Sequence, residues 1–286
     1  MVWIAVPDQD LTPEPFLPGE AEELMATGNF NQDVEVIIGT NSDEGLLNII
    51  NLLVDPTQWD EYRDNFDTET IPIMFNIPNQ SDITGDDIEK AHELVEFYVG
   101  SMVNINEDHK QGIFDLGTDS WFLYGTYKTI KYLLQYGVTV YQYVLTYRGK
   151  FSWSQLYGLD PPQGVCHADD LIYLWNPVSS TKYFPKVGVN FQKIKSLLIS
   201  TGGDQDEIPI GPLDVSDSLV RELMTSTWVN FAKYGDPTPP NSGLSWTPVQ
   251  SGLEHQFWNI SGHKPTMASS QYIRERMEKW RNVLGD

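Results

Sequence analysis

Three short runs rich in β-branched and aromatic residues lie far apart along the chain, and their spacing constrains the fold more than any other feature. They cover residues 33–41, 138–148 and 255–261. Such runs are typical of strands. Helical patterns occupy residues 86–100, 118–137, 217–235 and 270–284. This alternation of strands and helices predicts an α/β architecture, with a mostly parallel central sheet flanked by helices.

Capping residues indicate where several of these elements end. Gly100 closes the helical pattern at residues 86–100 and is expected to be its C-cap. In the long helix expected at residues 217–235, Asp217 is placed for an N-cap and Gly235 for a stop. Residues 55–90 are rich in Pro, Asp and Asn and indicate loops with short helices. Long connections between strands are typical of functional insertions.

Composition excludes several classes of function. The chain has 286 residues and a formal net charge of -22, so neither a nucleic acid nor an anionic membrane surface is an expected partner. No apolar run approaches the roughly 18 residues that a membrane-spanning helix needs, so no transmembrane segment is expected. Cys166 is the only cysteine, so no disulfide can close within the chain. An apolar fraction of 40% is enough for a large core.

The stretch GVCHADDLIYLW contains His167, the first candidate for chemistry. A metal site with Asp169 and Asp170 has no H-x-x-x-H pair to support it. A Cys166 nucleophile activated by His167 is disfavoured, because side chains adjacent in extended backbone point apart, so a packed thiol is expected. As a general base or acid, His167 has a suitable ordinary pKa but needs a carboxylate to hold its ring. Asp169 and Asp170 lie too close in sequence to orient that ring well.

A second stretch, GTNSDEG, supplies acidic residues just after the strand expected at residues 33–41. Asp43 or Glu44 could orient a catalytic histidine, and the competing interpretation is a solvated turn with a helix N-cap at Ser42 or Asp43. A nucleophile is harder to find, because the sequence contains no G-x-S-x-G elbow. The nearest string, GTDSW around Ser120, lacks the second glycine and lies within a helical pattern. No nucleotide-binding motif is present either.

Taken together, these segments resemble the type-B carboxylesterase and cholinesterase family of α/β-hydrolases over nearly the whole chain. The resemblance rests on FLPGEAEELMATGNF, VEVIIGTNSDEG, GVCHADDLIYLW and STWVNFAKYGDPTPP, followed by FWNIS and RERMEKWRNVL. These strings occur in the family's order. The HADDL form is most similar to that of arthropod carboxylesterases. The resemblance implies an ester hydrolase that acts on a small-molecule ester and needs no cofactor and no metal.

The resemblance also implies site residues. The family's catalytic triad is Ser-Glu-His in chain order, which assigns the acid to Glu44 and the base to His167. Asp169 and Asp170 are expected either to support the base from behind or to form a solvated first helical turn. The family's nucleophilic serine and its glycine-rich oxyanion loop precede these segments. Residues 1–286 are therefore expected to be the C-terminal portion of a single carboxylesterase domain, lacking its nucleophile and inactive alone.

Two other interpretations stay open at the level of sequence. A non-catalytic cholinesterase-like adhesion or binding protein would keep the fold, and a truncated product would have no function. Retention of both Glu44 and His167 favours the enzyme, because a binding protein needs neither. The family slightly favours secretion over a cytosolic location. Since the first ten residues contain no signal-peptide pattern, we expect either that the protein is not exported or that Met1 is not the true start.

Overall fold

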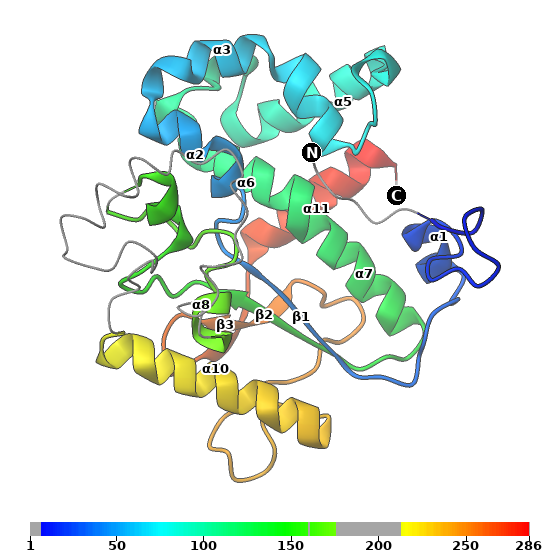
Figure 1. Ribbon diagram of the computed structural model, residues 1–286, viewed down its shortest axis with the longest axis vertical. Coiled ribbons are helices and arrows are strands. Elements are labelled where there is room, and N and C mark those ends of the chain that lie inside the picture. Colours follow the sequence, from blue (N-terminus) through cyan, green and yellow to red (C-terminus); the bar gives the residue numbers. More distant parts are fainter. Residues whose placement is uncertain (1–6, 160, 176–212, 286) are drawn as a thin grey trace.

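The structure is a computed structural model, and it describes residues 7–159, 161–175 and 213–285. Its centre is a four-stranded sheet with strand order β1-β2-β3-β4 (Figure 1). The strands are β1 (Val36–Asn41), β2 (Val140–Leu145), β3 (Gln256–Ile260) and β4 (Thr266–Ser269). The prediction of a single domain over residues 1–286 also covers residues outside the described ranges and stays a prediction.

The sheet is mostly parallel, as predicted. β1 pairs with β2 in parallel, with Asn41 opposite Leu145, and β2 pairs with β3 in parallel. β4 was not predicted, and it pairs antiparallel to β3. The strand has only four residues and none of them is buried, so its sequence gives no alternating pattern of apolar and polar residues. β1 is at the edge of the sheet among the strands that the structure describes.

Helices lie on both faces of the sheet and above its edge (Figure 1). The described helices are α1 (Ala21–Ala26), α2 (Leu46–Val54), α3 (Trp59–Asp64), α4 (Ile71–Met74), α5 (Gly85–Val99), α6 (Lys110–Thr118), α7 (Tyr124–Gln135), α8 (Leu171–Leu174), α10 (Val215–Tyr234) and α11 (Gln271–Leu284). Two five-residue turns of π-helix, at residues 66–70 and 119–123, join α3 to α4 and α6 to α7.

The expected caps are mostly where the sequence predicts them. α5 begins in a capping box between Thr84 and Asp87 and ends at Gly100, whose φ of 81° needs glycine. α10 ends at Gly235, also as predicted. Its N-cap is Asp214, however, so the prediction of Asp217 is wrong. Asp217 lies in the first turn, where its backbone N–H donates to the Asp214 carboxylate at 2.8 Å.

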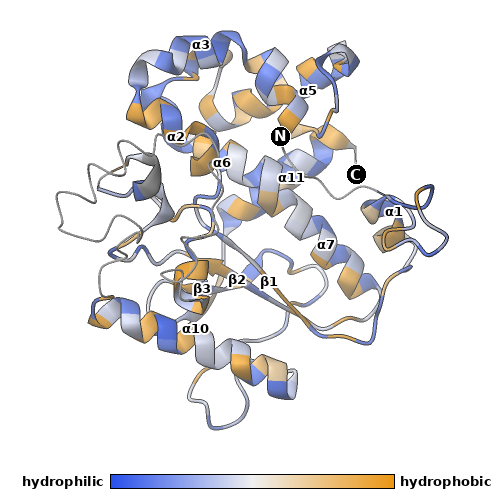
Figure 2. Ribbon diagram, in the orientation of Figure 1, coloured by the Kyte–Doolittle hydropathy of each residue, from blue (hydrophilic) through white to orange (hydrophobic). Residues whose placement is uncertain are grey.

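Three clusters of buried apolar side chains hold these layers together. α8 and α10 pack against one face of the sheet around Tyr143, Trp246 and Trp258, and α7 packs against the other face around Ile130 and Val140. The third cluster lies between α2, α5, α6 and α11. Figure 2 shows hydrophobic residues along the strands and a mixture of hydrophobic and hydrophilic residues on α10, as expected where one side of a helix faces solvent.

Candidate active site

The carboxyl ends of β1 and β2 lie side by side at the same end of the sheet, because the two strands are parallel. β1 ends at Asn41, and the backbone N–H of Ser42 donates to the Leu145 carbonyl at 3.0 Å, which continues the pairing by one residue. The chain then turns through Asp43 and Glu44 into α2. Glu44 is consequently held directly beyond the carboxyl end of β1 and is only 5% exposed.

The turn after β1 needs glycine at its end because backbone packs against it there. A Cβ on Gly45 would lie closer than contact distance to the Phe114 carbonyl oxygen and the Thr118 backbone nitrogen. The backbone N–H of Gly45 also donates to Thr118 Oγ1 at 2.9 Å. This close approach fixes the turn that carries Glu44 against α6.

Glu44 and His167 are brought together although they lie 123 residues apart in the chain. His167 Nδ1 lies 2.7 Å from Glu44 Oε2, and the Asn41 backbone N–H donates to Glu44 Oε1 at 2.8 Å. The carboxylate is thus held at both oxygens, and in the neutral ring it selects the tautomer with a proton on Nδ1. The Glu44 side chain is 7% exposed and that of His167 is 43% exposed. A buried acid therefore orients a ring that solvent can reach.

This pairing favours the protonated ring. The hydrogen bond that Nδ1–H donates to Glu44 raises the pKa of His167 above its ordinary value, and burial opposes that rise. The charges of Glu44, Asp170 and Asp169 add to the rise. An imidazolium that forms during a reaction would be stabilised by the same groups. No hydrogen bond joins Nε2 to a side chain or backbone group among the residues that the structure describes.

The loop that carries His167 has an uncommon backbone conformation. Ala168 adopts a positive φ of 70°, which non-glycine residues seldom do. Its carbonyl oxygen accepts a hydrogen bond from Trp153 Nε1 at 2.8 Å. A further pair of hydrogen bonds joins the loop to the acid turn. Asp43 N donates to the Val165 carbonyl at 3.1 Å, and Val165 N donates to Asp43 Oδ2 at 2.9 Å.

Asp169 supports this loop from behind and does not hydrogen-bond to His167 in the described structure. Its carboxylate accepts from the Cys166 backbone N–H at 2.8 Å, the Ser152 hydroxyl at 2.7 Å and the Trp153 backbone N–H at 2.8 Å. Burial outweighs these bonds and raises the pKa of Asp169 to about 7. At 4% exposure Asp169 is not part of a solvated helical turn, so that expectation is wrong for it.

Asp170 faces the sheet. Its carboxylate accepts from the Tyr143 hydroxyl at 2.9 Å and from Asn41 Nδ2 at 3.3 Å. Asp170 is the N-cap residue of α8, but its side chain makes no capping hydrogen bond. The two aspartates after His167 therefore bind neighbouring segments and leave Glu44 as the carboxylate that contacts the ring.

The competing interpretation of the GTNSDEG turn as a solvated N-cap is wrong. The N-cap residue of α2 is Gly45, with no side-chain capping bond. Asp43 Oδ2 accepts from Ser42 Oγ at 2.7 Å in addition to Val165. The polar side chains of this turn are thus directed toward the turn itself and the histidine loop.

Sequence reasoning missed two residues at this site. The ring of Phe122 lies against that of His167, with centroids 4.8 Å apart and planes inclined by 34°. Phe122 belongs to the π-helical turn at residues 119–123, and π-turns occur often at functional sites. Asn41 was missed as well. The aromatic string SWFLY gave a general signal for a pocket wall, but nothing in it distinguished Phe122 from its neighbours.

The remaining candidates lie apart from the pair. Cys166 is fully buried, and burial raises the pKa of its thiol to about 12, as expected for a packed residue. Ser120 Oγ donates to the Gly117 carbonyl at 3.3 Å within its own helix. Across residues 7–159, 161–175 and 213–285, no group of three or more His, Cys, Asp or Glu side chains could hold a metal ion. In the same ranges, no helix is both long and apolar enough to cross a membrane.

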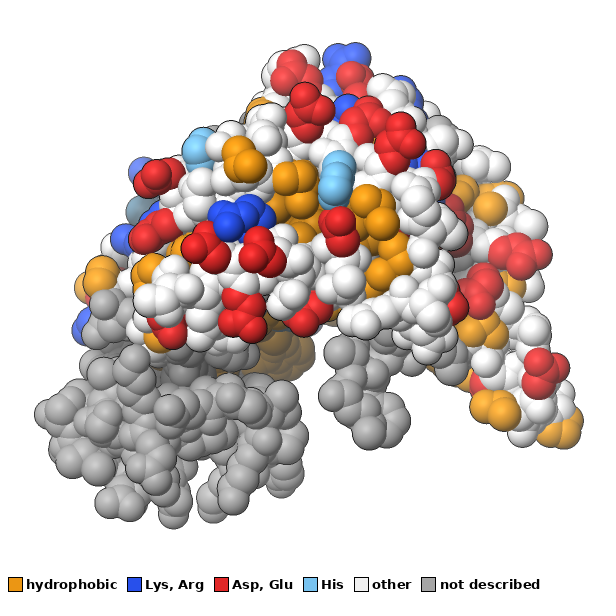
Figure 3. Space-filling model, turned by 90° about the horizontal axis from the view of Figure 1, so that it is seen from above, with side chains coloured by type: hydrophobic (Ala, Val, Ile, Leu, Met, Phe, Trp, Pro, Cys, Tyr) orange, Lys and Arg blue, Asp and Glu red, His pale blue; other side chains and the backbone are white. Residues whose placement is uncertain are grey.

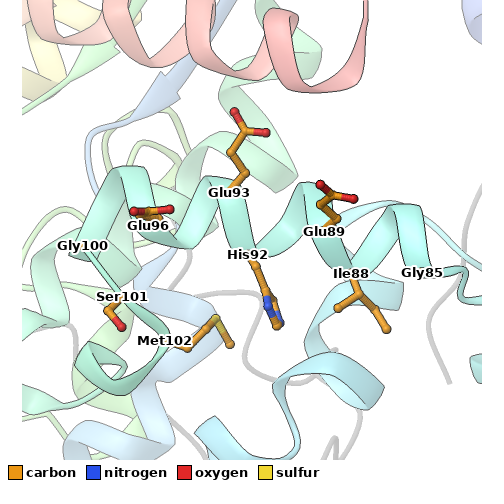
Figure 4. A pocket seen from close by; sticks show the side chains of 9 residues that line it. All are labelled: Gly85, Ile88, Glu89, His92, Glu93, Glu96, Gly100, Ser101 and Met102. Atoms are coloured by element: carbon orange, nitrogen blue, oxygen red, sulfur yellow. The ribbon is translucent and has the colours of Figure 1, made fainter.

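Two cavities lie elsewhere on the described surface. The larger, of about 730 Å³, runs along α5 and has acidic residues at its rim; Figure 4 shows His92 and Met102 beside three of them, Glu89, Glu93 and Glu96. The other, of about 510 Å³, lies between α7 and α11. Neither is lined by Glu44 or His167. Figure 3 shows acidic side chains across the face seen from above, in keeping with the net charge of -22.

Comparison with known proteins gives three matches. The family model described as the carboxylesterase family matches residues 1–197. The juvenile hormone esterase of Tribolium castaneum is 27% identical over 250 residues, which cover 83% of this chain and 36% of that protein. The crystal structure of juvenile hormone esterase from Manduca sexta with OTFP covalently attached superposes with a TM-score of 0.65 at 18% identity, covering 94% of this chain and 44% of that one. The chain thus spans less than half the length of each relative.

Proposed function

The chain belongs to the carboxylesterase family and has the α/β-hydrolase fold, and we propose that it is the part of a carboxylic ester hydrolase that supplies the acid, Glu44, and the base, His167. The nucleophilic serine is proposed to come from a segment outside this sequence, since the 286 residues contain no G-x-S-x-G elbow. The chain alone is then inactive as a serine esterase.

The proposed reaction is acyl transfer through a covalent intermediate. The serine hydroxyl attacks the ester carbonyl while His167 Nε2 takes its proton, and His167 then donates that proton to the departing alcohol. Water repeats the sequence on the acyl-enzyme and releases the acid. Glu44 holds Nδ1 of the ring throughout and stabilises the imidazolium. No residue of this chain is proposed to bind a cofactor or a metal.

One observation carries this proposal: the 2.7 Å contact between Glu44 Oε2 and His167 Nδ1. It joins a buried carboxylate to a ring that is 43% exposed to solvent, an arrangement that suits proton transfer. A protein that only binds a partner gains nothing from burying a carboxylate in this way, because removing a charged group from water costs free energy. The pair therefore supports an enzyme over an adhesion or binding protein.

The proposed substrate is a small-molecule carboxylic ester. Both relatives are named juvenile hormone esterase, so we propose a juvenile hormone ester as the first substrate to test.

The test begins with the purified 286-residue chain and a fluorophosphonate probe. We expect no specific labelling of a serine. The transcript upstream of Met1 is then sequenced, and an extended protein that contains a G-x-S-x-G elbow is assayed for ester hydrolysis. Glu44→Gln and His167→Gln should each lower kcat by about 10⁴-fold or more, and His255→Gln should not. A serine labelled in the short chain, or activity that survives His167→Gln, would overturn the proposal.

A further inference from the structure

Asn41 is the last residue of β1 and bonds both to Glu44 and to the loop that carries His167. Its backbone N–H donates to Glu44 Oε1 at 2.8 Å. Its side-chain Nδ2 donates to the Cys166 carbonyl at 2.9 Å, directly before His167, and to Asp170 Oδ1 at 3.3 Å. One residue thus binds the acid with its backbone and the loop of the base with its side chain.

The orientation of the Asn41 amide is determined by its neighbours. Both groups that face Nδ2 are acceptors, a carbonyl oxygen and a carboxylate oxygen, so the nitrogen must lie on that side. Neither aspartate nor a hydroxyl residue could replace it, because aspartate has no donor and serine or threonine has only one. The geometry therefore requires the two N–H groups of an amide at this position.

The oxygen of the same amide, Oδ1, accepts no hydrogen bond from any described residue. Asn41 is 1% exposed, and its Oδ1 has no partner within the described part of the chain. A buried polar atom without a partner is costly, so packing alone would favour an apolar residue here. An amide is present here in spite of that cost, and the two bonds of its donor end indicate a role beyond filling space.

We propose that Asn41 is a positioning residue that couples Glu44 to His167, by holding the acid through its backbone and the histidine loop through its side-chain amide. This inference rests on the proposed function, because it assigns a role in the same acid–base pair. Without the Nδ2 bonds, two bonds between Val165 and Asp43 and the Glu44–His167 contact itself would be left to join the loop to the acid turn among the described residues. His167 would then leave Glu44 more often, and the influence of Glu44 on the ring would weaken.

The test is a double-mutant cycle that reads the pKa of His167 in the 286-residue chain. The Cε1–Hε1 signal of each of the five histidines is titrated by NMR, and His167→Gln identifies the relevant signal. The fall in the His167 pKa caused by Glu44→Gln is measured with Asn41 present and again in Asn41→Ala. We expect the fall in Asn41→Ala to be less than half of the fall with Asn41 present. Asn41→Asp keeps the shape of the side chain but removes its donors, and we expect the same reduction there.

Asn48 provides the matched control. It is a second asparagine near the turn, and its Oδ1 also lacks a partner among the described residues. Within the same residues its amide makes no hydrogen bond to Glu44 or to the His167 loop. Asn48→Ala should leave the effect of Glu44→Gln unchanged, whatever it does to the melting temperature. A merely structural role for Asn41 would likewise lower the melting temperature and leave that effect intact.

The outcomes separate this inference from the proposed function. If Glu44→Gln lowers the His167 pKa equally with and without the Asn41 amide, the role of Asn41 is refuted and the acid–base pair stands. If Glu44→Gln has no effect on that pKa in the presence of Asn41, the pair itself fails and the proposed function fails with it. Should Asn41→Ala lose its cooperative unfolding transition, Asn41→Asp carries the same comparison.

Discussion

Replacing Arg276 by methionine should destabilise the fold far more than an ordinary charge removal on the same helix. Arg276 lies on α11 with a side chain 6% exposed, and its guanidinium binds both carboxylate oxygens of Asp119, which is fully buried. It also lies 3.4 Å from the carboxylate of Asp115. The substitution keeps most of the side-chain volume but leaves two buried carboxylates without their cation.

The magnitude follows from that burial. Removing one partner of a buried ion pair costs about 3–5 kcal/mol, because the remaining charge stays desolvated. Domains of this kind are stable by about 5–15 kcal/mol, so the loss is a large share of the total. Urea denaturation at pH 7, followed by circular dichroism, measures the free energy of unfolding. The control is Arg274→Met, since the pair of Arg274 with Glu278 is exposed and should be worth about 0–1 kcal/mol.

The pH dependence gives the same reasoning a second test. Burial raises the pKa of Asp119, although its bonds to Arg276 oppose that rise. A carboxyl whose folded-state pKa is raised contributes stability below its unfolded pKa, and this contribution is lost as pH rises through the folded value. In Arg276→Met the bonds to the guanidinium are gone and the hydrogen bond from the Tyr98 hydroxyl still opposes the rise, so the loss of stability should be small near pH 4 and grow toward pH 7. A loss below about 1 kcal/mol at pH 7, or one independent of pH, would refute the argument.

Three further predictions concern the site and its turn. Phe122→Leu should lower the pKa of His167, because the ring face stabilises a cation by about 0.5–1 kcal/mol. Trp121→Leu should leave that pKa unchanged, and an unchanged NMR titration of His167 in Phe122→Leu would contradict the argument. The free energy of unfolding should fall as pH rises from 4 to 7, because burial raises the pKa of Asp169 to about 7. In urea titrations, Asp169→Asn should make the free energy of unfolding depend less on pH. An equal dependence in the variant would exclude Asp169 as its source. Gly45→Ala should destabilise the fold by about 1–3 kcal/mol, because the added Cβ overlaps with the backbone of α6. The control is Gly125→Ala in α7, where the Cβ has open space and should stabilise the fold by about 0.5–1 kcal/mol. Equal effects of the two substitutions in thermal melts would be inconsistent with the overlap.

Local elements were predictable from the sequence because their signals are local. The closing helix was expected at residues 270–284 and is found at Gln271–Leu284, since apolar periodicity and an N-cap serine occur in the same short stretch. The start of β1 was placed three residues too early, at residue 33 in place of Val36. Boundaries of this kind depend on where the neighbouring strand stops pairing, which the sequence of one strand does not contain.

The candidate site was only partly predictable. From the residues alone, Asp43 and Glu44 stayed equivalent candidates, and the resemblance to a family separated them. The contacts made by Asn41 and Phe122 join segments that are far apart in the chain, and so does the bond of Arg276 to Asp119, which spans 157 residues. The spacing of residues along the chain does not predict such pairings, because they depend on how helices pack and on the π-turn between α6 and α7.

That same packing explains why the pair can be studied in this chain. The acid turn is fixed by the register of β1 against β2 and by the approach of Gly45 to α6. The histidine loop is fixed by Asp169 and by two hydrogen bonds of Val165, one to the backbone and one to the side chain of Asp43. All of these groups belong to the described residues. A one-residue slip of β1 would instead reverse its side chains and separate the acid from the base. We therefore expect the 286-residue chain to show a Glu44-dependent His167 pKa even where it hydrolyses no ester, which separates assembly of the pair from the proposed ester hydrolysis.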